Sequence, residues 1–349
     1  MKENRRNIYD IAAEAGVSIA TVSRVMANHP HVSAGSRAKV MEVIKKNHYQ
    51  PGYRFCQNQM EHQNALGVIV PAYMHSYFAQ VLDEAEDEAR QHGFSLFPQR
   101  IVSDALANTQ MIGRMIASRL KGVIYVGGIT ESKRNALITD LIRLQAALPV
   151  VAISPPVSGL NCIYLCNDLA DITAQAVRHL QMLGHKRFAY IGGGSQIRSS
   201  GERGRGFLEE IEALKLPQGD YQHEAGFNPE DGELAVLRLY SNTTPASRPT
   251  ALLAFNDMVA LGALRQLNRM GLRVPEDVAV IGCDNQFFSA YTHPPMTTLD
   301  LHISEHSRCA VKLLIGEMES PATPFTQVRE PSLIIRESCG VKLGVRSIE

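Results

Sequence analysis

The chain has no long hydrophobic run. Nowhere in its 349 residues do uncharged apolar residues continue for the roughly eighteen positions that a membrane-spanning helix needs. The first residues also have no apolar core of the kind that a secretory signal peptide carries. These absences predict a protein that crosses no membrane and works in the cytoplasm.

Cysteine is sparse and poorly spaced for metal binding. The six cysteines include no C-x-x-C pair. Cys162 and Cys166 stand four apart in an apolar stretch without histidines nearby, which is poor spacing for zinc. We therefore expect buried thiols in a reducing compartment, and no metal site.

Signatures of common enzyme sites are missing as well. The twelve histidines form no H-E-x-x-H pattern, and no nucleophile elbow occurs. Gly192-Gly193-Gly194 follows an apolar run, but neither a phosphate-binding loop nor a complete dinucleotide fingerprint continues it. A glycine-rich turn in a ligand cleft explains this segment. We expect neither enzyme activity nor a cofactor.

Net charge is also absent, yet the charge is unevenly distributed. The chain holds 35 basic and 35 acidic residues, but residues 1–60 carry nine basic and four acidic ones. The remainder therefore has 26 basic and 31 acidic residues. A basic head on an acidic body suits a protein whose first segment binds phosphate, although a solvated charged face would explain either half alone.

Residues 8–25 have the pattern of two short helices joined by a glycine turn. The apolar positions of the first helix, spaced as one buried stripe, are Ile8, Ile11, Ala12 and Ala15. Gly16 can adopt the positive φ that ends this helix, and Ser18 can cap the next one. Ser33 is a plausible cap for a third helix. This arrangement predicts a helix-turn-helix whose second helix enters the major groove of DNA, although any small helical hairpin can look similar.

From residue 65 onward, continuous apolar runs alternate with helical patterns. Such runs are typical of parallel strands that helices cover on both faces. About 280 residues of this pattern are too many for one sheet, so we expect two α/β lobes. Ligands of such sheets bind beyond the carboxyl ends of the strands, where the candidate segments are 71–77, 192–203, 256–257 and 284–285.

Head and body together resemble the LacI/GalR family of bacterial transcription regulators over almost the whole chain. The motifs that carry the resemblance are Ile8-Tyr9-Asp10-Ile11-Ala12, Ala20-Thr21-Val22-Ser23-Arg24-Val25, Leu183-Gly184-His185, Glu202-Arg203-x-x-Gly206-Phe207 and Gly282-x-Asp284-Asn285. The resemblance implies an all-α helix-turn-helix head (1–50), a hinge (51–63) and an α/β body (64–349). The body would have two Rossmann-like parallel-sheet lobes similar to periplasmic sugar-binding proteins. We place the N-lobe at about 64–166 and 297–325, and the C-lobe at about 167–296 and 326–349.

The resemblance also implies a homodimer on a near-palindromic operator in double-stranded DNA. Ile19 and Ala20 match positions that approach the major groove, and Arg24 matches a base-reading position. Arginine can donate two hydrogen bonds to guanine, whereas Ile19 and Ala20 offer only apolar contact. Hydroxyl groups that can reach phosphate belong to Ser18, Thr21, Ser23 and Ser33. The remaining expected DNA contacts are Tyr49, Arg54, Phe55 and Asn58.

For the body, the resemblance implies a small effector between the lobes. Arg203 and Asp284 match the family's effector-binding arginine and aspartate, and a forked donor facing a carboxylate suits a polyhydroxylated ligand. Asn256 would add an amide contact. Tyr73, Tyr77 and Phe78 would offer aromatic faces. A sugar or sugar derivative is the effector expected by resemblance, with a nucleobase second, although a structural ion pair of Arg203 with Asp284 is the alternative.

Three departures from the family pattern concern the first helix pair, the hinge and the effector site. Ala27 stands where the family has asparagine, and Cys283 stands where an aromatic residue is common. In the hinge, Asn58 replaces a leucine that wedges into the minor groove, and Phe55 replaces a small alanine. These departures in the hinge favour an alternative function: the chain would be a small-molecule binding protein, or a two-lobed enzyme, whose DNA binding is weakened.

Overall fold

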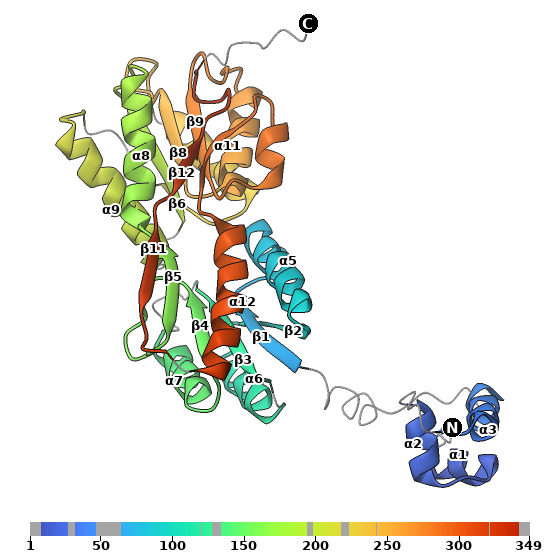
Figure 1. Ribbon diagram of the computed structural model, residues 1–349. Coiled ribbons are helices and arrows are strands. Elements are labelled where there is room, and N and C mark those ends of the chain that lie inside the picture. The colour runs from blue at the N-terminus through green and yellow to red at the C-terminus, as the bar shows by residue number, and fades with distance from the viewer. Residues whose placement is uncertain are drawn as a thin grey trace, which may run out of the picture. The chain divides into compact units, whose positions relative to one another are not determined.

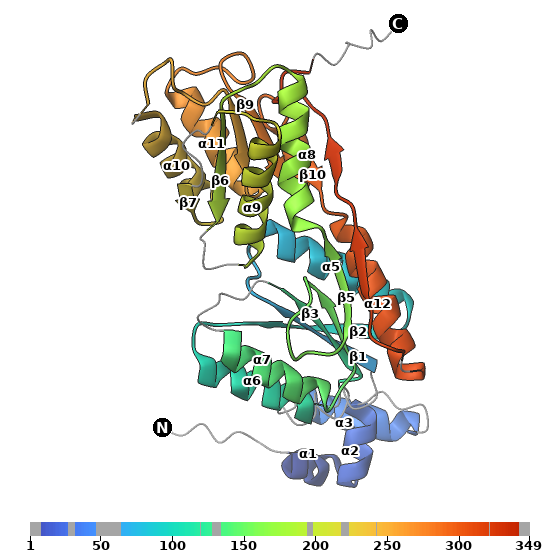
Figure 2. The same ribbon diagram turned by 90° about the vertical axis from the view of Figure 1, so that its left-hand side faces the viewer.

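The computed structural model describes residues 8–26, 32–46, 64–118, 120–127, 134–193, 198–217, 223–241, 243–320 and 322–341. The chain divides into two compact units, a head up to Asn64 and a body from Ala65 onward (Figures 1 and 2). Among the described residues, every helix is too short or too polar to traverse a bilayer. The expected helical head and two parallel-sheet lobes are confirmed.

The described residues of the head form three helices around a small apolar core. They are α1 (Ile8–Ala15), α2 (Ile19–Met26) and α3 (Ala34–Lys46). Gly16 has a φ of 65° and ends α1, as expected, because a side chain would be strained there. The buried side chains come from all three helices: Ile11, Ala12, Ala15, Val22, Val25 and Val40. Burial of these side chains fixes α2 against α1 and α3, so that the opposite face of α2 points outward.

The first lobe of the body has a six-stranded sheet in the order β11-β5-β4-β3-β1-β2. Every described pairing from β1 through β3, β4 and β5 to β11 is parallel. The strands are β1 (Asn64–Val70), β2 (Phe94–Arg100), β3 (Gly122–Val126), β4 (Val150–Ile153), β5 (Ile163–Asn167) and β11 (Thr326–Arg329). The helices of this lobe are α5 (Ser76–Gln91), α6 (Ala105–Ala117), α7 (Arg134–Gln145) and α12 (Ile303–Glu319). Figure 2 shows α5 and α12 on one face of the sheet, with α6 and α7 on the other.

The second lobe repeats this order as β12-β10-β9-β8-β6-β7. Its pairings are parallel except that β12 runs antiparallel to β10. The strands are β6 (Phe188–Gly193), β7 (His223–Ala225), β8 (Ala251–Ala254), β9 (Ala279–Cys283), β10 (Thr297–Asp300) and β12 (Ser332–Ile334). The helices are α8 (Leu169–Met182), α9 (Arg198–Ala213), α10 (Pro229–Ser241), α11 (Asp257–Arg269) and the 3₁₀ helix η2 (Phe287–Tyr291).

The chain crosses between the lobes three times, and two crossings differ from the expected boundaries. We expected residues 297–325 in the first lobe, but β10 pairs with β9 in the second. We expected residues 326–349 in the second lobe, but β11 pairs with β5 in the first. Both expectations were wrong by one short strand. A strand belongs to the lobe whose sheet it forms hydrogen bonds with, and the apolar runs of the sequence do not show which sheet that is.

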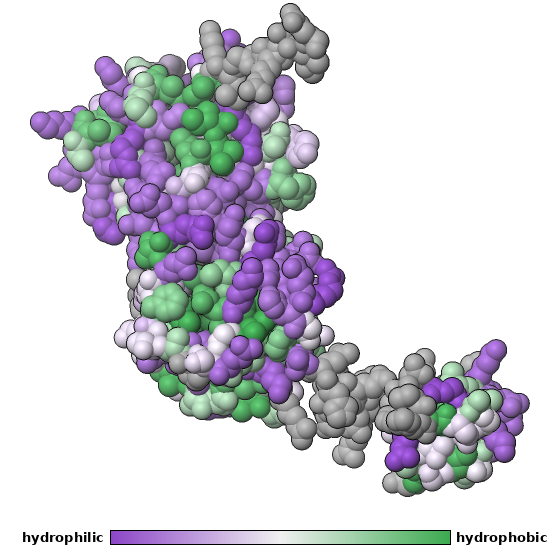
Figure 3. All heavy atoms as spheres, in the orientation of Figure 1, coloured by the Kyte–Doolittle hydropathy of each residue, from purple (hydrophilic) through white to green (hydrophobic). Residues whose placement is uncertain are grey.

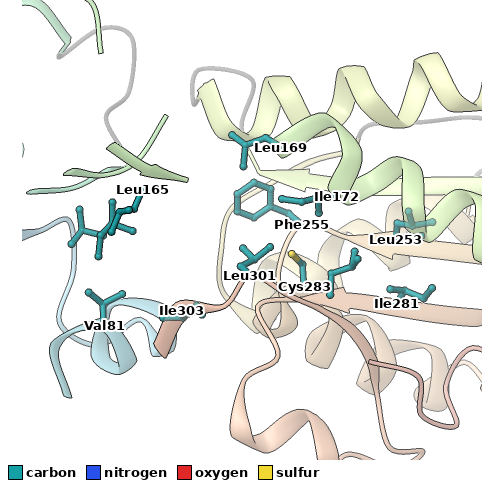
Figure 4. Close-up of a cluster of buried hydrophobic side chains, with 14 of the residues drawn as sticks. Val81, Leu165, Leu169, Ile172, Leu253, Phe255, Ile281, Cys283, Leu301 and Ile303 are labelled. Atoms are coloured by element: carbon teal, nitrogen blue, oxygen red, sulfur yellow. The ribbon is translucent and has the colours of Figure 1, made fainter. Parts of the chain in front are cut away.

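One buried hydrophobic cluster continues from the first lobe into the second. Figure 4 shows Leu169, Phe255 and Leu301 between members of the two lobes such as Leu165 and Ile281. Thiols are buried, as expected, at Cys162, Cys166, Cys283 and Cys339, whereas Cys309 is only partly buried. On the face in Figure 3, hydrophilic residues cover most of the body, with hydrophobic patches over both lobes. The continuous cluster joins the lobes next to the cavity described below.

Candidate functional site

A cavity of about 510 Å³ lies between the two lobes of the body. It is bounded by residues that follow the carboxyl ends of strands in both sheets, as expected for parallel α/β lobes. In the first lobe these residues follow β1, β3 and β4, and in the second they follow β6, β8 and β9. Its size suits a small molecule of one or two rings.

Arg203 enters the cavity from inside α9, not from the loop before it. A Cβ at Gly206 would lie 2.1 Å from the carbonyl oxygen of Ala170, so this glycine lets α9 pack closely on α8. The Thr173 hydroxyl donates to the Arg203 carbonyl at 2.6 Å and fixes the same turn. Close packing of the two helices therefore sets the position of the arginine.

The Arg203 side chain is buried and held from one side. Its Nη1 donates to the carbonyl oxygen of Phe255 at 2.5 Å, and its guanidinium carbon lies 4.4 Å from the Phe255 ring centroid. Nε is buried without a hydrogen-bond partner among the described residues. A rigid, incompletely paired guanidinium is a strong donor site for oxygen-rich ligands.

Asp284 reaches the cavity from a strained turn at the end of β9. Its φ is 109°, and Asn285 follows with a φ of 48°. The Asp284 amide donates to the Leu299 carbonyl at 2.8 Å, which holds the turn. Non-glycine residues in such conformations cost about 1–3 kcal/mol each and gather at functional sites. The strain therefore marks this turn as one that serves the cavity.

Burial raises the pKa of Asp284 to about 7, and the nearby Arg203 only partly offsets this rise. The described part of the chain contains no direct ion pair between the two side chains, so both can contact a ligand. The neighbouring Cys283 side chain also acts to lower the pKa of Asp284, but less than burial raises it. A carboxyl with a pKa near neutrality can donate or accept a hydrogen bond.

Asn256 lines the cavity, but its amide is already engaged. Its Oδ1 accepts from the Val259 amide at 2.8 Å and caps α11. Its Nδ2 donates to the Phe227 carbonyl and to His75 Nε2, each at 3.2 Å. The sequence suggested a direct ligand contact, whereas this geometry makes Asn256 a link between the lobes.

A second hydrogen bond also crosses between the lobes. Gln286 Nε2 donates to Gln80 Oε1 at 3.0 Å. The Gln286 amide donates to the buried Asp257 carboxylate at 2.7 Å, which ties the crossing to α11. Burial raises the pKa of Asp257 well above its ordinary value. These contacts hold the lobes around the cavity.

Of the three expected aromatic residues, the structure brings two to the cavity. Tyr77 and Phe78 line it, with ring centroids 5.1 Å apart in an edge-to-face arrangement. Burial, with Asp284 adding to it, raises the pKa of Tyr77. Tyr73 does not line the cavity, because its ring is partly exposed and its hydroxyl donates to the Pro98 carbonyl at 3.2 Å.

Several polar or aromatic residues that line the cavity were not among the expected effector contacts, among them His75, Asn167, Phe227 and His306. His75 lies inside the strand-end segment 71–77, so its position after β1 was the available signal. His306 lies in the first turn of α12 beside a crossing, and burial lowers its pKa to about 4, with Arg329 adding to this effect. Within the described ranges, no group of three potential metal ligands occurs.

The expected DNA-reading residues of α2 face outward. Ile19, Ala20 and Arg24 are exposed, as a recognition surface requires. Ser18 Oγ accepts from the Thr21 amide at 3.2 Å and is 2.9 Å from the Thr21 hydroxyl.

The structure describes only some of the other expected DNA contacts. Ser33 Oγ accepts from the Ser36 amide at 3.2 Å, which makes it the cap of α3. Ser23 is half-buried on α2. The expected contacts of Tyr49, Arg54, Phe55 and Asn58 lie outside the described residues.

Both the head and the body match models of known protein families. Residues 7–52 match the model of bacterial regulatory proteins, lacI family, and residues 177–339 match a periplasmic binding protein-like domain. The transcriptional repressor PurR of Haemophilus influenzae (strain PittEE) is 30% identical, over 95% of this chain and 98% of its own length. The chain belongs to the lacI family of bacterial regulatory proteins.

Solved structures agree with this membership. The lac repressor dimer bound to operator and the anti-inducer ONPF has a TM-score of 0.70 and 26% identity, over 96% of this chain and 99% of its own. A complex of the regulator CelR with cellobiose has a TM-score of 0.68 and 25% identity, over 96% of this chain and all of its own. This lacI-family protein is therefore a DNA-binding transcription regulator with an effector-binding body.

Proposed function

We propose that this lacI-family protein represses transcription as a cytoplasmic homodimer on a near-palindromic operator. A small carbohydrate-class effector in the cavity controls it, and the protein catalyses no reaction. This proposal is supported above all by one observation: the same chain has an exposed α2 surface in its head and a buried Arg203 near Asp284 in the cavity of its body. Effector contacts in the body would then change the affinity of the head for DNA.

Arg24 is the proposed base reader. Its side chain is exposed on α2, and arginine binds guanine O6 and N7 with two parallel hydrogen bonds. At an operator selected in vitro, Arg24→Ala should cost about 1–3 kcal/mol and relax preference at one base pair. Arg24→Lys is the matched control, because it keeps the charge but loses the fork. Equal losses on all sequences would make Arg24 a phosphate contact.

The effector is proposed to be polyhydroxylated. Arg203 supplies donors, and Asp284, with a pKa near 7, accepts or donates. The related CelR has been solved with cellobiose, which supports this class. A nucleobase would form fewer hydrogen bonds with Arg203 and Asp284, because it presents fewer hydroxyl groups.

A homodimer is proposed because one helix-turn-helix reads only a few base pairs. Large apolar side chains stand exposed on the second lobe, with Phe287 at 80% and Tyr291 at 84%. An interface between two copies would cover such residues. Light scattering at micromolar concentration should give twice the mass of one chain, and a monomer that still binds the operator tightly would contradict the proposal.

A further inference from the structure

A second, much smaller cavity of about 10 Å³ lies inside the second lobe. Residues of the sheet line one side of it, and residues of α8 and α9 line the other. It is distinct from the ligand cavity, although Arg203 and Phe255 border both. A space of this volume holds about one water molecule when polar groups surround it.

Two buried polar groups at the smaller cavity have no hydrogen-bond partner among the described residues. They are the Tyr190 hydroxyl and Arg203 Nε. A buried donor that is left unpaired loses its hydration without compensation, and the loss is greatest for a charged group. Native proteins rarely accept this loss, and a buried water molecule often supplies the missing partner. Because both groups border the same small space, one water molecule can pair with both.

Gly192 lets the Tyr190 ring lie along β6. Side chains two residues apart on a strand share one face of the sheet, and a Cβ at Gly192 would lie 2.8 Å from Tyr190 Cε1. The ring therefore covers Gly192, and its hydroxyl is directed toward the carboxyl end of β6. Gly192 belongs to the glycine run 192–194, which we expected to be a turn, but it lies within the strand and makes room for the tyrosine.

Helix α9 places Arg203 in the direction of this hydroxyl. The Phe207 ring stacks on the Tyr190 ring, with centroids 5.7 Å apart and an interplanar angle of 27°. Arg203 precedes Phe207 by four residues, so the two side chains share one face of α9. Burial raises the pKa of Tyr190, and the charge of Arg203 opposes part of this rise, as expected for two groups that lie close together.

A third polar group at the smaller cavity is the thiol of Cys283. Cys283 stands where the family commonly has an aromatic residue, and a thiol occupies less space than an aromatic ring. A thiol is both a weak donor and a weak acceptor of hydrogen bonds. With the Arg203 Nε–H and the Tyr190 hydroxyl, it gives the cavity three polar neighbours, the usual number of partners for a buried water molecule.

We propose that a buried water molecule in the smaller cavity accepts a hydrogen bond from Arg203 Nε and shares another with the Tyr190 hydroxyl. Tyr190 is then a positioning residue for Arg203. It acts together with the Phe255 carbonyl, which accepts from Nη1, and holds the guanidinium from inside the second lobe. The consequence for effector binding rests on the proposed function, whereas the water molecule itself does not.

Two matched tyrosine substitutions test the proposal by crystallography of the full chain. Tyr190→Phe removes one hydroxyl and keeps the ring that stacks on Phe207. Tyr240→Phe is the control, because Tyr240 is a buried tyrosine of the same lobe that donates to the Pro249 carbonyl at 2.7 Å and lines neither cavity. A water molecule should lie within hydrogen-bonding distance of Arg203 Nε in the wild type and in Tyr240→Phe, and be absent from Tyr190→Phe.

NMR of the arginine side chains tests the same contact in solution, without a ligand. The chain is labelled with ¹⁵N at arginine Nε, and the Arg203 signal is identified by its loss in Arg203→Lys. Tyr190→Phe should shift this signal and speed the exchange of its proton with solvent several-fold, because the guanidinium is held less firmly. Tyr240→Phe should change neither property. A smaller cavity without water in the wild type, or an Arg203 signal unchanged in Tyr190→Phe, would overturn the proposal.

Calorimetry measures the consequence for binding with a panel of glycosides, the methyl β-glycosides of glucose, galactose and xylose together with cellobiose. Tyr190→Phe should weaken the tightest glycoside about two- to ten-fold. In the Arg203→Lys background it should add no further loss, because lysine has no Nε group. An equal loss in both backgrounds would overturn the positioning role. If no glycoside binds, the proposed effector class is wrong, while the crystal structures and the NMR signal still decide this proposal.

Discussion

The two lobes share one strand order, so each strand end of the first lobe has a counterpart in the second. Ser154 follows β4, whereas Asp284 follows its counterpart β9. Gly127 follows β3, whereas Asn256 follows β8. The backbone brings strand ends of both sheets to one cavity, but the side chains of Arg203 and Asp284 both come from the second lobe. The repeated fold therefore fixes where a ligand binds, and the side chains at equivalent positions decide which part of it each lobe holds.

The largest effect should come from the second-lobe side of the cavity. Arg203→Ala should weaken the tightest glycoside by about 2–5 kcal/mol, because a buried charged donor is lost. Arg205→Ala is the matched control: Arg205 lies two residues further along α9, is exposed and pairs with Glu209. Calorimetry measures both variants. Normal binding by Arg203→Ala would show that the ligand does not use this side.

The second prediction concerns the pH dependence of stability. The pKa of Asp284 is raised from 3.8 to about 7, so the folded state holds a proton that the unfolded state releases. Its contribution to the free energy of unfolding must therefore fall as the pH rises from about 4 to 7. Asp284→Asn should remove a decline on the order of 2–4 kcal/mol across this window. Part of the decline in the free energy of unfolding with pH should remain in this variant, because the pKa of the buried Asp257 is raised too.

Asp277→Asn serves as the control for this pH profile. Arg273 lowers the pKa of the partly exposed Asp277 to about 2, so the stabilisation from this carboxylate is present above pH 4 and is lost in more acidic solution. Between pH 5 and 8 this variant should shift stability by a constant amount. Chemical denaturation across pH measures both variants, and an unchanged slope in Asp284→Asn would contradict the assignment.

The third prediction concerns the contact that joins the lobes. Gln80→Ala and Gln286→Ala remove the two sides of one hydrogen bond, each weakening ligand binding by about 0.5–1.5 kcal/mol. If the bond stabilises the ligand-bound arrangement, the double variant should be weaker than wild type by less than the sum of the single effects. Strictly additive effects would mean that the two residues act independently.

The smallest effect should come from the first-lobe counterpart of Asp284. Ser154→Ala should change ligand affinity by less than about 0.5 kcal/mol, because its hydroxyl already donates to the Pro155 carbonyl. Asp284→Ala, measured by the same calorimetry, provides the contrast. A loss at Ser154 as large as that at Asp284 would remove the distinction between the two sides of the cavity.

Much of the fold could be predicted from the sequence because its signals are local. The glycine turn at Gly16, the caps Ser18 and Ser33 and the buried stripe of α1 all depend on residues a few positions apart. Continuous apolar runs likewise predicted parallel strands. The assignment of β10 and β11 to their lobes failed, because partners in a sheet are chosen by contacts distant in sequence.

The candidate site was predictable only in part. Arg203 and Asp284 could be proposed from the resemblance, and the structure places both on the cavity. The engagement of Asn256 by His75 could not, because the two residues are 181 positions apart and meet only when the lobes fold. Tyr73 and Tyr77 both follow β1, but Tyr73 lies in the loop, where its hydroxyl donates to the Pro98 carbonyl, whereas Tyr77 lies in α5 and lines the cavity.

Linkage between the cavity and the head tests the account most directly. Fluorescence anisotropy gives the Kd of the selected operator with and without a saturating glycoside, and calorimetry gives the Kd of the glycoside with and without operator. The two ratios must be equal, because coupling between binding sites is reciprocal. We predict a common factor of about 5–150, with Arg203→Ala requiring far more ligand to produce it. A glycoside that binds the cavity tightly and leaves operator affinity unchanged would contradict the account.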